Sequence, residues 1–195
     1  NGMWAGYRAF NLKHSEALME GLCISNVSYA GQSEKGTGAA IRLQNGTVRN
    51  CRITGCRTQG AYQNGTAVHI SGGLLTGTEI DRCQTDWEYE CHGGAIYLTG
   101  GVVSNCWIHN LTETRDFNAS NNDGGLAAGV TAGLMTHCLI ESNVRTKAAQ
   151  GGVVSVSGTG IVRNTILRGN GGTSQTAGFK VTGGRVEHCT IYGNN

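Results

Sequence analysis

A degenerate repeat constrains the fold of this chain more than any other feature. Fragments such as GTVRNCRI (46–53), GVVSNCWI (101–108) and GRVEHCTI (184–191) share a glycine, an aliphatic residue two positions later, Asn or His, then Cys or Thr, and a closing aliphatic residue. Repeats of about 20 to 50 residues indicate a solenoid, in which each unit packs on its neighbours. The closing aliphatic recurs every 24 to 32 residues, at Ile24, Ile53, Ile80, Ile108, Ile140, Leu167 and Ile191.

A second apolar run precedes most of these closing positions. The segments AAIRL (39–43), TAVHI (66–70) and GAIYL (94–98) alternate apolar and polar residues, which is typical of a strand with one buried face. No helical period is present. Each repeat is therefore predicted to form a strand, a glycine turn, a second strand, a one-residue corner, a third strand and a variable loop. The predicted fold is all-β: a parallel β-solenoid of about seven coils, each with three short strands.

The residue at the predicted corner is always of a type that tolerates positive φ. A sharp corner made by one residue requires a left-handed backbone, which Gly adopts freely and which Asn and His adopt more readily than most other types. The corner positions are Gly21, Asn50, Gly77, Asn105, His137, Asn164 and His188.

Composition limits the classes of protein that remain. The 195 residues are enough for one core, so a single domain over 1–195 is expected. Thirty-two glycines and no proline fit many tight turns and argue against collagen. The net charge of +2 without a basic cluster gives no sign of a nucleic-acid partner. No apolar run is long enough to predict a transmembrane helix.

The repeat resembles the right-handed parallel β-helix superfamily, whose first described members are pectate lyases. In that superfamily a left-handed Asn forms one turn of each coil, and right-handedness also follows the crossover rule for parallel strands. GGAI (93–96), IESN (140–143) and LRGN (167–170) resemble the GGAI and FxxN repeats of polymorphic outer-membrane proteins, with aliphatic residues in place of Phe. The resemblance implies a fold rather than one function, because the superfamily includes lyases, hydrolases, adhesins and tailspikes.

The cysteines follow the repeat. The position after the corner holds Leu22, Cys51, Thr78, Cys106, Cys138, Thr165 and Cys189. This column is expected to face the core, where Cys acts as a small apolar residue. Cys56 and Cys83 share a second column, and Cys91 lies in the loop that follows, so a disulfide among these three is a further hypothesis.

Cys106 and His109 look like half of a metal site but are predicted not to form one. Cys106 should face the core, whereas His109 follows core residue Ile108 and should point to solvent beside Trp107. A zinc site needs three or four converging ligands, so no metal is expected there.

The outward column of the first strand carries the one catalytic alternative. Arg42, His69 and Tyr97 should lie on successive coils, on the face that carries the active site in many β-helix enzymes. A polysaccharide lyase needs a group that neutralises a uronate carboxylate, a base and an acid, and these residues suit those roles. The other interpretation is an ordinary solvated strand face.

Two long loops form a second candidate site, for ligand binding. Residues 84–94 and 111–125 should leave adjacent coils at the same corner and bring aromatic and acidic side chains together, which would suit a sugar or a protein surface. No cofactor is expected, although NASNNDGG (118–125) offers oxygen ligands for calcium without a regular spacing. The binding residues of this hypothesis are Trp87, Glu88, Tyr89, Asp116 and Phe117.

The sequence favours an extracellular or cell-surface structural protein, adhesive or filament-forming and non-catalytic. A solenoid needs caps on its terminal coils, and the repeat runs to VEHCTIYGNN (186–195). The expected partners are therefore flanking coils of the same protein or another copy stacked end to end, with a polysaccharide as a possible ligand.

Overall fold

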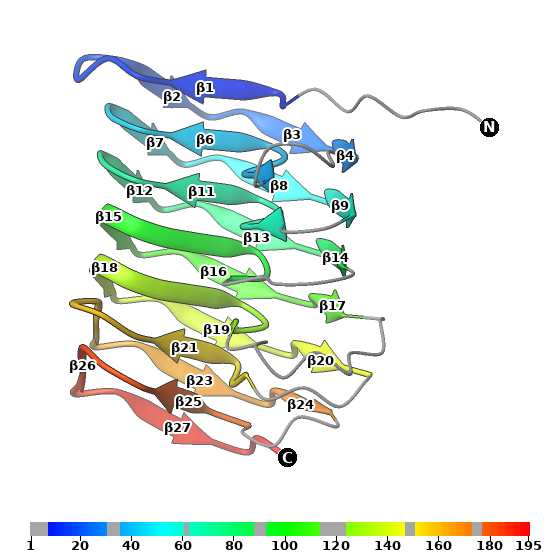
Figure 1. Ribbon diagram of the computed structural model, residues 1–195, viewed down its shortest axis with the longest axis vertical. Helices are drawn as coiled ribbons and strands as arrows, with labels where there is room; N and C mark the ends of the chain where they lie inside the picture. Colours follow the sequence, from blue (N-terminus) through cyan, green and yellow to red (C-terminus); the bar gives the residue numbers. More distant parts are fainter. Residues whose placement is uncertain are drawn as a thin grey trace.

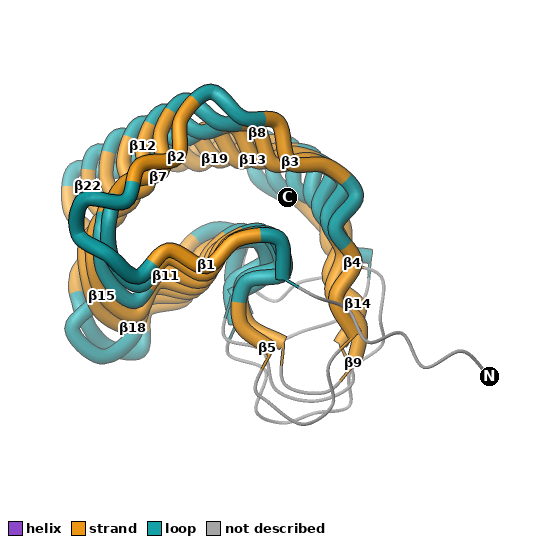
Figure 2. The backbone as a smooth tube through the Cα atoms, turned by 90° about the horizontal axis from the view of Figure 1, so that it is seen from above, coloured by secondary structure: helices purple, strands orange, loops and turns teal. Residues whose placement is uncertain are grey.

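The computed structural model describes residues 8–30, 36–60, 63–87, 93–113, 124–146, 151–172 and 177–195. The fold is an all-β parallel solenoid, and the described residues contain no helix (Figure 1). It follows that no helix in this part of the chain is long and apolar enough to cross a membrane. Seen from the N-terminal end in Figure 2, the chain runs clockwise as it recedes, which is the right-handed sense.

Three parallel sheets form the walls of the solenoid. The first sheet has twelve strands, the second has seven, and the third has six. In the first sheet, one row consists of β1 (Phe10–Leu12), β6 (Ile41–Leu43), β11 (Val68–Ile70), β15 (Ile96–Ser104), β18 (Ala128–Thr136), β21 (Val154–Val156) and β25 (Phe179–Val181). The other row consists of β2 (Leu18–Glu20), β7 (Thr47–Arg49), β12 (Leu74–Thr76), the second halves of β15 and β18, β22 (Ile161–Arg163) and β26 (Arg185–Glu187).

The remaining sheets complete each coil. The second sheet is β3 (Cys23–Ser25), β8 (Arg52–Thr54), β13 (Glu79–Asp81), β16 (Trp107–His109), β19 (Leu139–Glu141), β23 (Ile166–Arg168) and β27 (Thr190–Tyr192). The third sheet is β4 (Ser28–Ala30), β9 (Arg57–Gly60), β14 (Gln84–Trp87), β17 (Thr112–Glu113), β20 (Val144–Arg145) and β24 (Gly171–Gly172). A separate pair joins β5 (Gly36–Thr37) to β10 (Gln63–Asn64).

The predicted repeat is confirmed, with one addition. Each of the seven repeats contributes a strand to the second sheet. Five of them lie between two others, so the solenoid has about five turns enclosed on both sides, fewer than the seven coils that the sequence predicts. The third sheet occupies part of what the sequence suggested was variable loop. Its strands are two to four residues long, which is too short for a periodic pattern to show.

The closing aliphatic residues stack in register through the core. Ile80 pairs with Ile53 on one side and Ile108 on the other, and all three are completely buried. One continuous hydrophobic cluster runs from Leu12 to Leu167. The structure thus has a single core that is shared by every coil.

All seven predicted corner residues have positive φ, between 48° and 68°. A second set of left-handed corners, which the sequence analysis missed, lies five residues further on in every repeat. Its members are Asn26, Gly55, Arg82, Asn110, Ser142, Gly169 and Gly193. Arg82 and Ser142 are not types that favour positive φ, so the column does not stand out in the sequence.

The predicted glycine turn between the first and second strands is also present. Gly101 has a φ of 79°, and a Cβ atom there would lie 2.5 Å from the carbonyl oxygen of Gly73 on the previous coil. Only glycine allows the two turns to stack this closely.

Buried asparagines join the last coils just after the second corner. The Asn170 side chain donates to the Ile140 carbonyl at 3.0 Å and to Asn194 Oδ1 at 2.9 Å. Its own Oδ1 accepts from the Asn143 side chain at 2.9 Å and from the Asn143 amide at 3.2 Å. Asn143 and Asn170 are fully buried. Their side-chain amides therefore supply the hydrogen bonds that the neighbouring backbone groups would otherwise need from water.

Asn170→Ala is expected to lower the free energy of unfolding by about 2–4 kcal/mol, because several buried polar groups lose their partners. The measurement is urea denaturation followed by circular dichroism. Asn11→Ala is the matched control, since Asn11 is exposed on β1 and should change stability by less than about 0.5 kcal/mol. Equal effects of the two variants would contradict a role for the Asn170 ladder.

Candidate functional site

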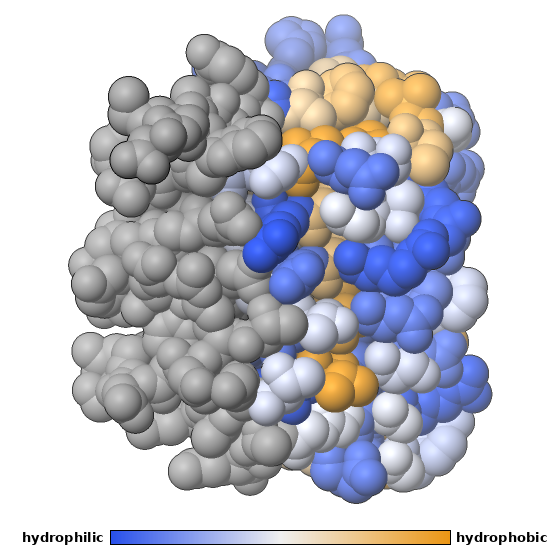
Figure 3. Space-filling model, turned by 90° about the vertical axis from the view of Figure 1, so that its right-hand side faces the viewer, coloured by the Kyte–Doolittle hydropathy of each residue, from blue (hydrophilic) through white to orange (hydrophobic). Residues whose placement is uncertain are grey.

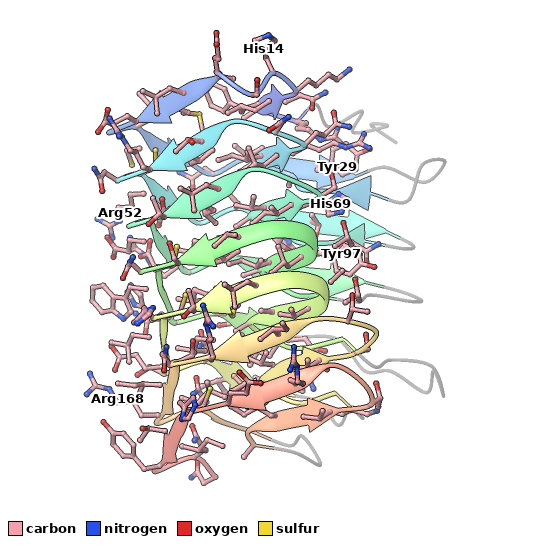
Figure 4. The ribbon with its side chains drawn as sticks, turned by 90° about the vertical axis from the view of Figure 1, so that its left-hand side faces the viewer. His14, Tyr29, Arg52, His69, Tyr97 and Arg168 are labelled. Atoms are coloured by element: carbon pink, nitrogen blue, oxygen red, sulfur yellow. The ribbon has the colours of Figure 1, made fainter. Side chains whose placement is uncertain are left out.

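Two outward faces carry chemically active side chains. The first is the outer face of β6, β11 and β15, with Arg42, His69 and Tyr97. The second is the outer face of the second sheet around Trp107, called here the Trp107 face. In Figure 4, Arg52 and Arg168 of the second sheet project from one side of the solenoid, and His69 and Tyr97 lie on the other. The two faces are therefore separate candidates.

The structure brings together the three residues of the lyase hypothesis. His69 pairs with Arg42 on one side and Tyr97 on the other. The His69 and Tyr97 rings are stacked, with centroids 5.2 Å apart and planes 20° apart. His69 Nε2 lies 3.3 Å from Thr99 Oγ1, and only 8% of the residue is exposed.

The electrostatics of this face keep His69 neutral. Burial, together with the charges of Arg42 and Arg8, lowers the pKa of His69 to about 4. Three buried atoms in this outward column, Arg42 Nε, His69 Nδ1 and Ser155 Oγ, have no hydrogen-bond partner among the described residues. Unsatisfied buried polar atoms are uncommon in folded proteins, so this column holds hydrogen-bonding capacity that its own contacts leave unused.

The depressed pKa of His69 predicts a pH-dependent stability. Between pH 6.5 and about 4 the unfolded chain binds a proton at His69 and the folded chain does not, so stability is lost as the pH falls through this window. His69→Phe removes this contribution. Between pH 7 and pH 4 the free energy of unfolding should therefore fall less in His69→Phe than in the wild type. The difference between the two drops should be roughly 2 kcal/mol.

Urea titrations at several pH values check this expectation. His14→Gln, at an exposed position in the first coil, serves as the control and should keep the wild-type pH profile. An unchanged profile in His69→Phe would show that His69 titrates normally in the folded chain.

The Trp107 face is built from two outward columns of the second sheet. Trp107 pairs with Glu79 and Leu139 on the adjacent coils, and His109 pairs with Asp81 and Glu141. The Trp107 and His109 rings stack with centroids 3.9 Å apart and planes 17° apart. The indole Nε1 donates to Glu141 Oε1 at 2.8 Å. The indole is held on two sides, yet 42% of the residue is exposed.

His109 lies outside the core, as predicted, but it does not point freely to solvent. Only 7% of it is exposed, because Trp107 covers the ring. His109 Nε2 lies 3.0 Å from Glu79 Oε1, and Nδ1 lies 2.8 Å from the Asn110 side-chain nitrogen. Cys106 is buried inside the wall, with its sulfur 3.3 Å from the Ser104 carbonyl. The two side chains do not converge, as expected.

Glu79, Asp81 and His109 offer ligand atoms within 4.8 Å of one another, which is close enough for a metal site. Both Asp81 oxygens already accept hydrogen bonds from Arg52, at 3.4 and 3.2 Å, and Arg82 donates to one of them at 2.7 Å. Although burial acts to raise the pKa of Asp81, the hydrogen bonds from Arg52 and Arg82 hold it below its usual value. Two adjacent guanidinium groups oppose a divalent cation, so the cluster fits an ion-pair network better than a metal centre.

The network continues to the next coils. Arg168 donates to Glu141 and, at 3.2 Å, to the Tyr192 hydroxyl. The hydrogen bond from Arg168, with a further one from Trp107, lowers the pKa of Glu141. Asp81 and Glu141 therefore each have an arginine partner that favours the ionised form of the carboxylate.

A buried ion pair that sequence reasoning missed lies inside the third sheet. Glu113 on β17 pairs with Arg145 on β20, and each side chain is only 1% exposed. Arg145 Nη1 also donates to the Gly151 carbonyl at 2.7 Å. Burial raises the pKa of Glu113 against the opposing effect of Arg145. Nothing in the sequence marks this pair, because its members belong to different coils and to very short strands.

Arg145→Ala should cost about 3–5 kcal/mol of stability, since it leaves the Glu113 carboxyl group buried without its cation. The double variant Glu113→Leu/Arg145→Met replaces the pair by apolar groups of similar volume and should be much closer to wild type. Thermal and urea denaturation of both variants test this. A loss below about 0.5 kcal/mol in Arg145→Ala would indicate that the pair is solvated.

The predicted loop site lies outside the described residues. Only the backbone of Trp87 is described, as the end of β14. Glu88, Tyr89, Asp116 and Phe117, and the calcium candidate at 118–123, fall in the undescribed ranges. The hypothesis of a binding site on these loops therefore stays a prediction.

The cysteine columns lie where the repeat predicts. Cys51, Cys106 and Cys138 are buried in the core, whereas Leu22 on the first coil is 42% exposed. Cys56 and Cys83 are buried free thiols. A hydrogen bond with Cys56, and burial, raise the pKa of Cys83. The structure therefore has no disulfide between Cys56 and Cys83, and because Cys91 lies outside the described residues, its pairing stays a prediction.

Comparisons with known proteins identify no relative of this chain. No protein-family model matches it, and searches of curated proteins and of solved structures found no match.

Proposed function

We propose that the chain is a non-catalytic structural β-solenoid of an extracellular or cell-surface assembly, acting as a rigid adhesive rod or as part of a filament. The observation that carries this proposal is the single core that runs through every coil. Each coil is also paired in register with the next in the first and second sheets. A rod of this kind keeps outward side chains at fixed spacings, which suits display and adhesion.

The proposed partners are further coils, from the same protein or from another copy. Ile191 lies in the same column as Leu167, yet it is 52% exposed whereas Leu167 is completely buried. At the other end the core-facing residues Leu12, Met19 and Ile24 are buried, and Leu18, which faces outward on β2, is 55% exposed. Figure 3 shows hydrophobic residues gathered near the N-terminal end of one side of the molecule. A coil stacked on β27 would bury Ile191, as β27 itself covers Leu167 of β23.

Concentration-dependent assembly tests the stacking hypothesis. We expect particle length, measured by electron microscopy and light scattering, to rise with protein concentration. Ile191→Asp should keep the particles short, because it places a charge where the next coil would pack. Val144→Asp is the control, since Val144 is 44% exposed on the third sheet and should assemble as the wild type does. Particles that remain monomeric at all concentrations would contradict self-stacking.

A polysaccharide lyase is the second candidate function. It is favoured by the register of Arg42, His69 and Tyr97, and by Arg42 Nε and His69 Nδ1, for which the described part of the chain offers no hydrogen-bond partner. In this hypothesis Arg42 neutralises the uronate carboxylate, neutral His69 removes the α-proton, and Tyr97 protonates the leaving oxygen.

The absorbance of the unsaturated product on a panel of uronate polysaccharides separates the two functions. The structural proposal expects no turnover on any substrate. Turnover that disappears in His69→Ala and persists in His14→Ala would overturn it in favour of the lyase.

A further inference from the structure

We propose that the Trp107 face binds an uncharged polysaccharide chain along the solenoid axis. This inference rests on the proposed adhesive role and names the class of ligand for it. It concerns the second sheet, not the face that carries the lyase hypothesis.

The first support is an exposed aromatic ring that is already fixed in position. Trp107 stacks on His109 and donates to Glu141, so its rotamer is held before any ligand arrives. Although the ring is held by these two contacts, 42% of the residue stays exposed and can contact a ligand. A rigid aromatic side chain binds with little loss of conformational entropy.

The second support is the charge balance of the face. Arg52 and Arg82 are paired with Glu79 and Asp81, and Arg168 is paired with Glu141. Three cations and three carboxylates therefore neutralise one another. An ionic ligand would have to break these pairs, whereas sugar hydroxyl groups can donate to the carboxylates and accept from the guanidinium groups while the pairs stay intact.

The third support is the arrangement of apolar and polar columns. Along the axis, Trp107 is followed by Leu139 and Ile166 in one outward column, and Ile166 is 40% exposed. The neighbouring column holds Glu141, Arg168 and Tyr192, with Tyr192 50% exposed. A pyranose ring has an apolar C–H face and a hydroxyl edge, so it matches an apolar column beside a polar one.

The length of the face favours a chain over a single sugar. Trp107 and Tyr192 lie three strands apart in the second sheet, which is about 14 Å at the usual strand spacing. Trp107, Ile166 and Tyr192 are exposed along this distance, with half-buried Leu139 between the first two, and exposed apolar surface beside polar groups is typical of a recognition surface.

Retention on insoluble or immobilised polysaccharides tests the proposal. The neutral panel is cellulose, mannan, β-1,3-glucan and chitin, and the acidic panel is alginate and pectate. We expect wild-type protein to bind at least one neutral polysaccharide and Trp107→Ala to bind it at least about tenfold more weakly. Val144→Ala, which removes exposed apolar surface from the third sheet, should bind as the wild type does.

Two further measurements guard against a folding defect in Trp107→Ala. Glu141→Gln keeps the indole but removes one charge of the Arg168 pair, and we expect it to weaken binding with an unchanged circular dichroism spectrum. Soluble oligosaccharides of the retained polymer should change the tryptophan fluorescence of the wild type, and the change should be absent in Trp107→Ala.

Three results would overturn the inference: no retention on any neutral polysaccharide, retention that Trp107→Ala leaves unchanged, or retention on the acidic panel alone. The last result, if lost in His69→Ala, would assign binding to the first-sheet face. None of these results decides the structural proposal, because particle length and uronate turnover are measured independently.

Discussion

In-register parallel pairing between coils is the constraint on which the rest of the structure depends. Because residue positions repeat from coil to coil, a side chain that faces the core on one coil lies above its equivalent on the next. Ile53, Ile80 and Ile108 form such a column, and all are completely buried. A shift of one residue in any coil would turn its core column outward, so the register and the core specify each other.

The same register builds the outer faces. Arg42, His69 and Tyr97 meet because their strands are equivalent members of neighbouring coils, and Trp107 meets Glu141 because β16 pairs with β19. Side chains far apart in the sequence thus become neighbours about one strand spacing apart. The solenoid therefore makes extended surfaces more readily than enclosed pockets.

The repeat predicted the fold and the first corner ladder because both depend on local chemistry. Residues such as Asn105 and His137 reveal the corner by their tolerance of positive φ. The second corner ladder was missed at Arg82 and Ser142, where the surrounding coils impose the left-handed backbone on residue types that do not favour it. The short third sheet was missed because strands such as Thr112–Glu113 are too short to show alternation.

By itself, the sequence determined the parallel solenoid, its core columns and the neighbours within each outward column, since these follow from periodicity. Only the tertiary structure decided how those neighbours interact. It placed His109 under Trp107 instead of in solvent, paired Asp81 with two arginines, and buried Glu113 against Arg145. These contacts depend on side-chain rotamers and on the height of one coil above the next, and neither is encoded in the spacing of residue types.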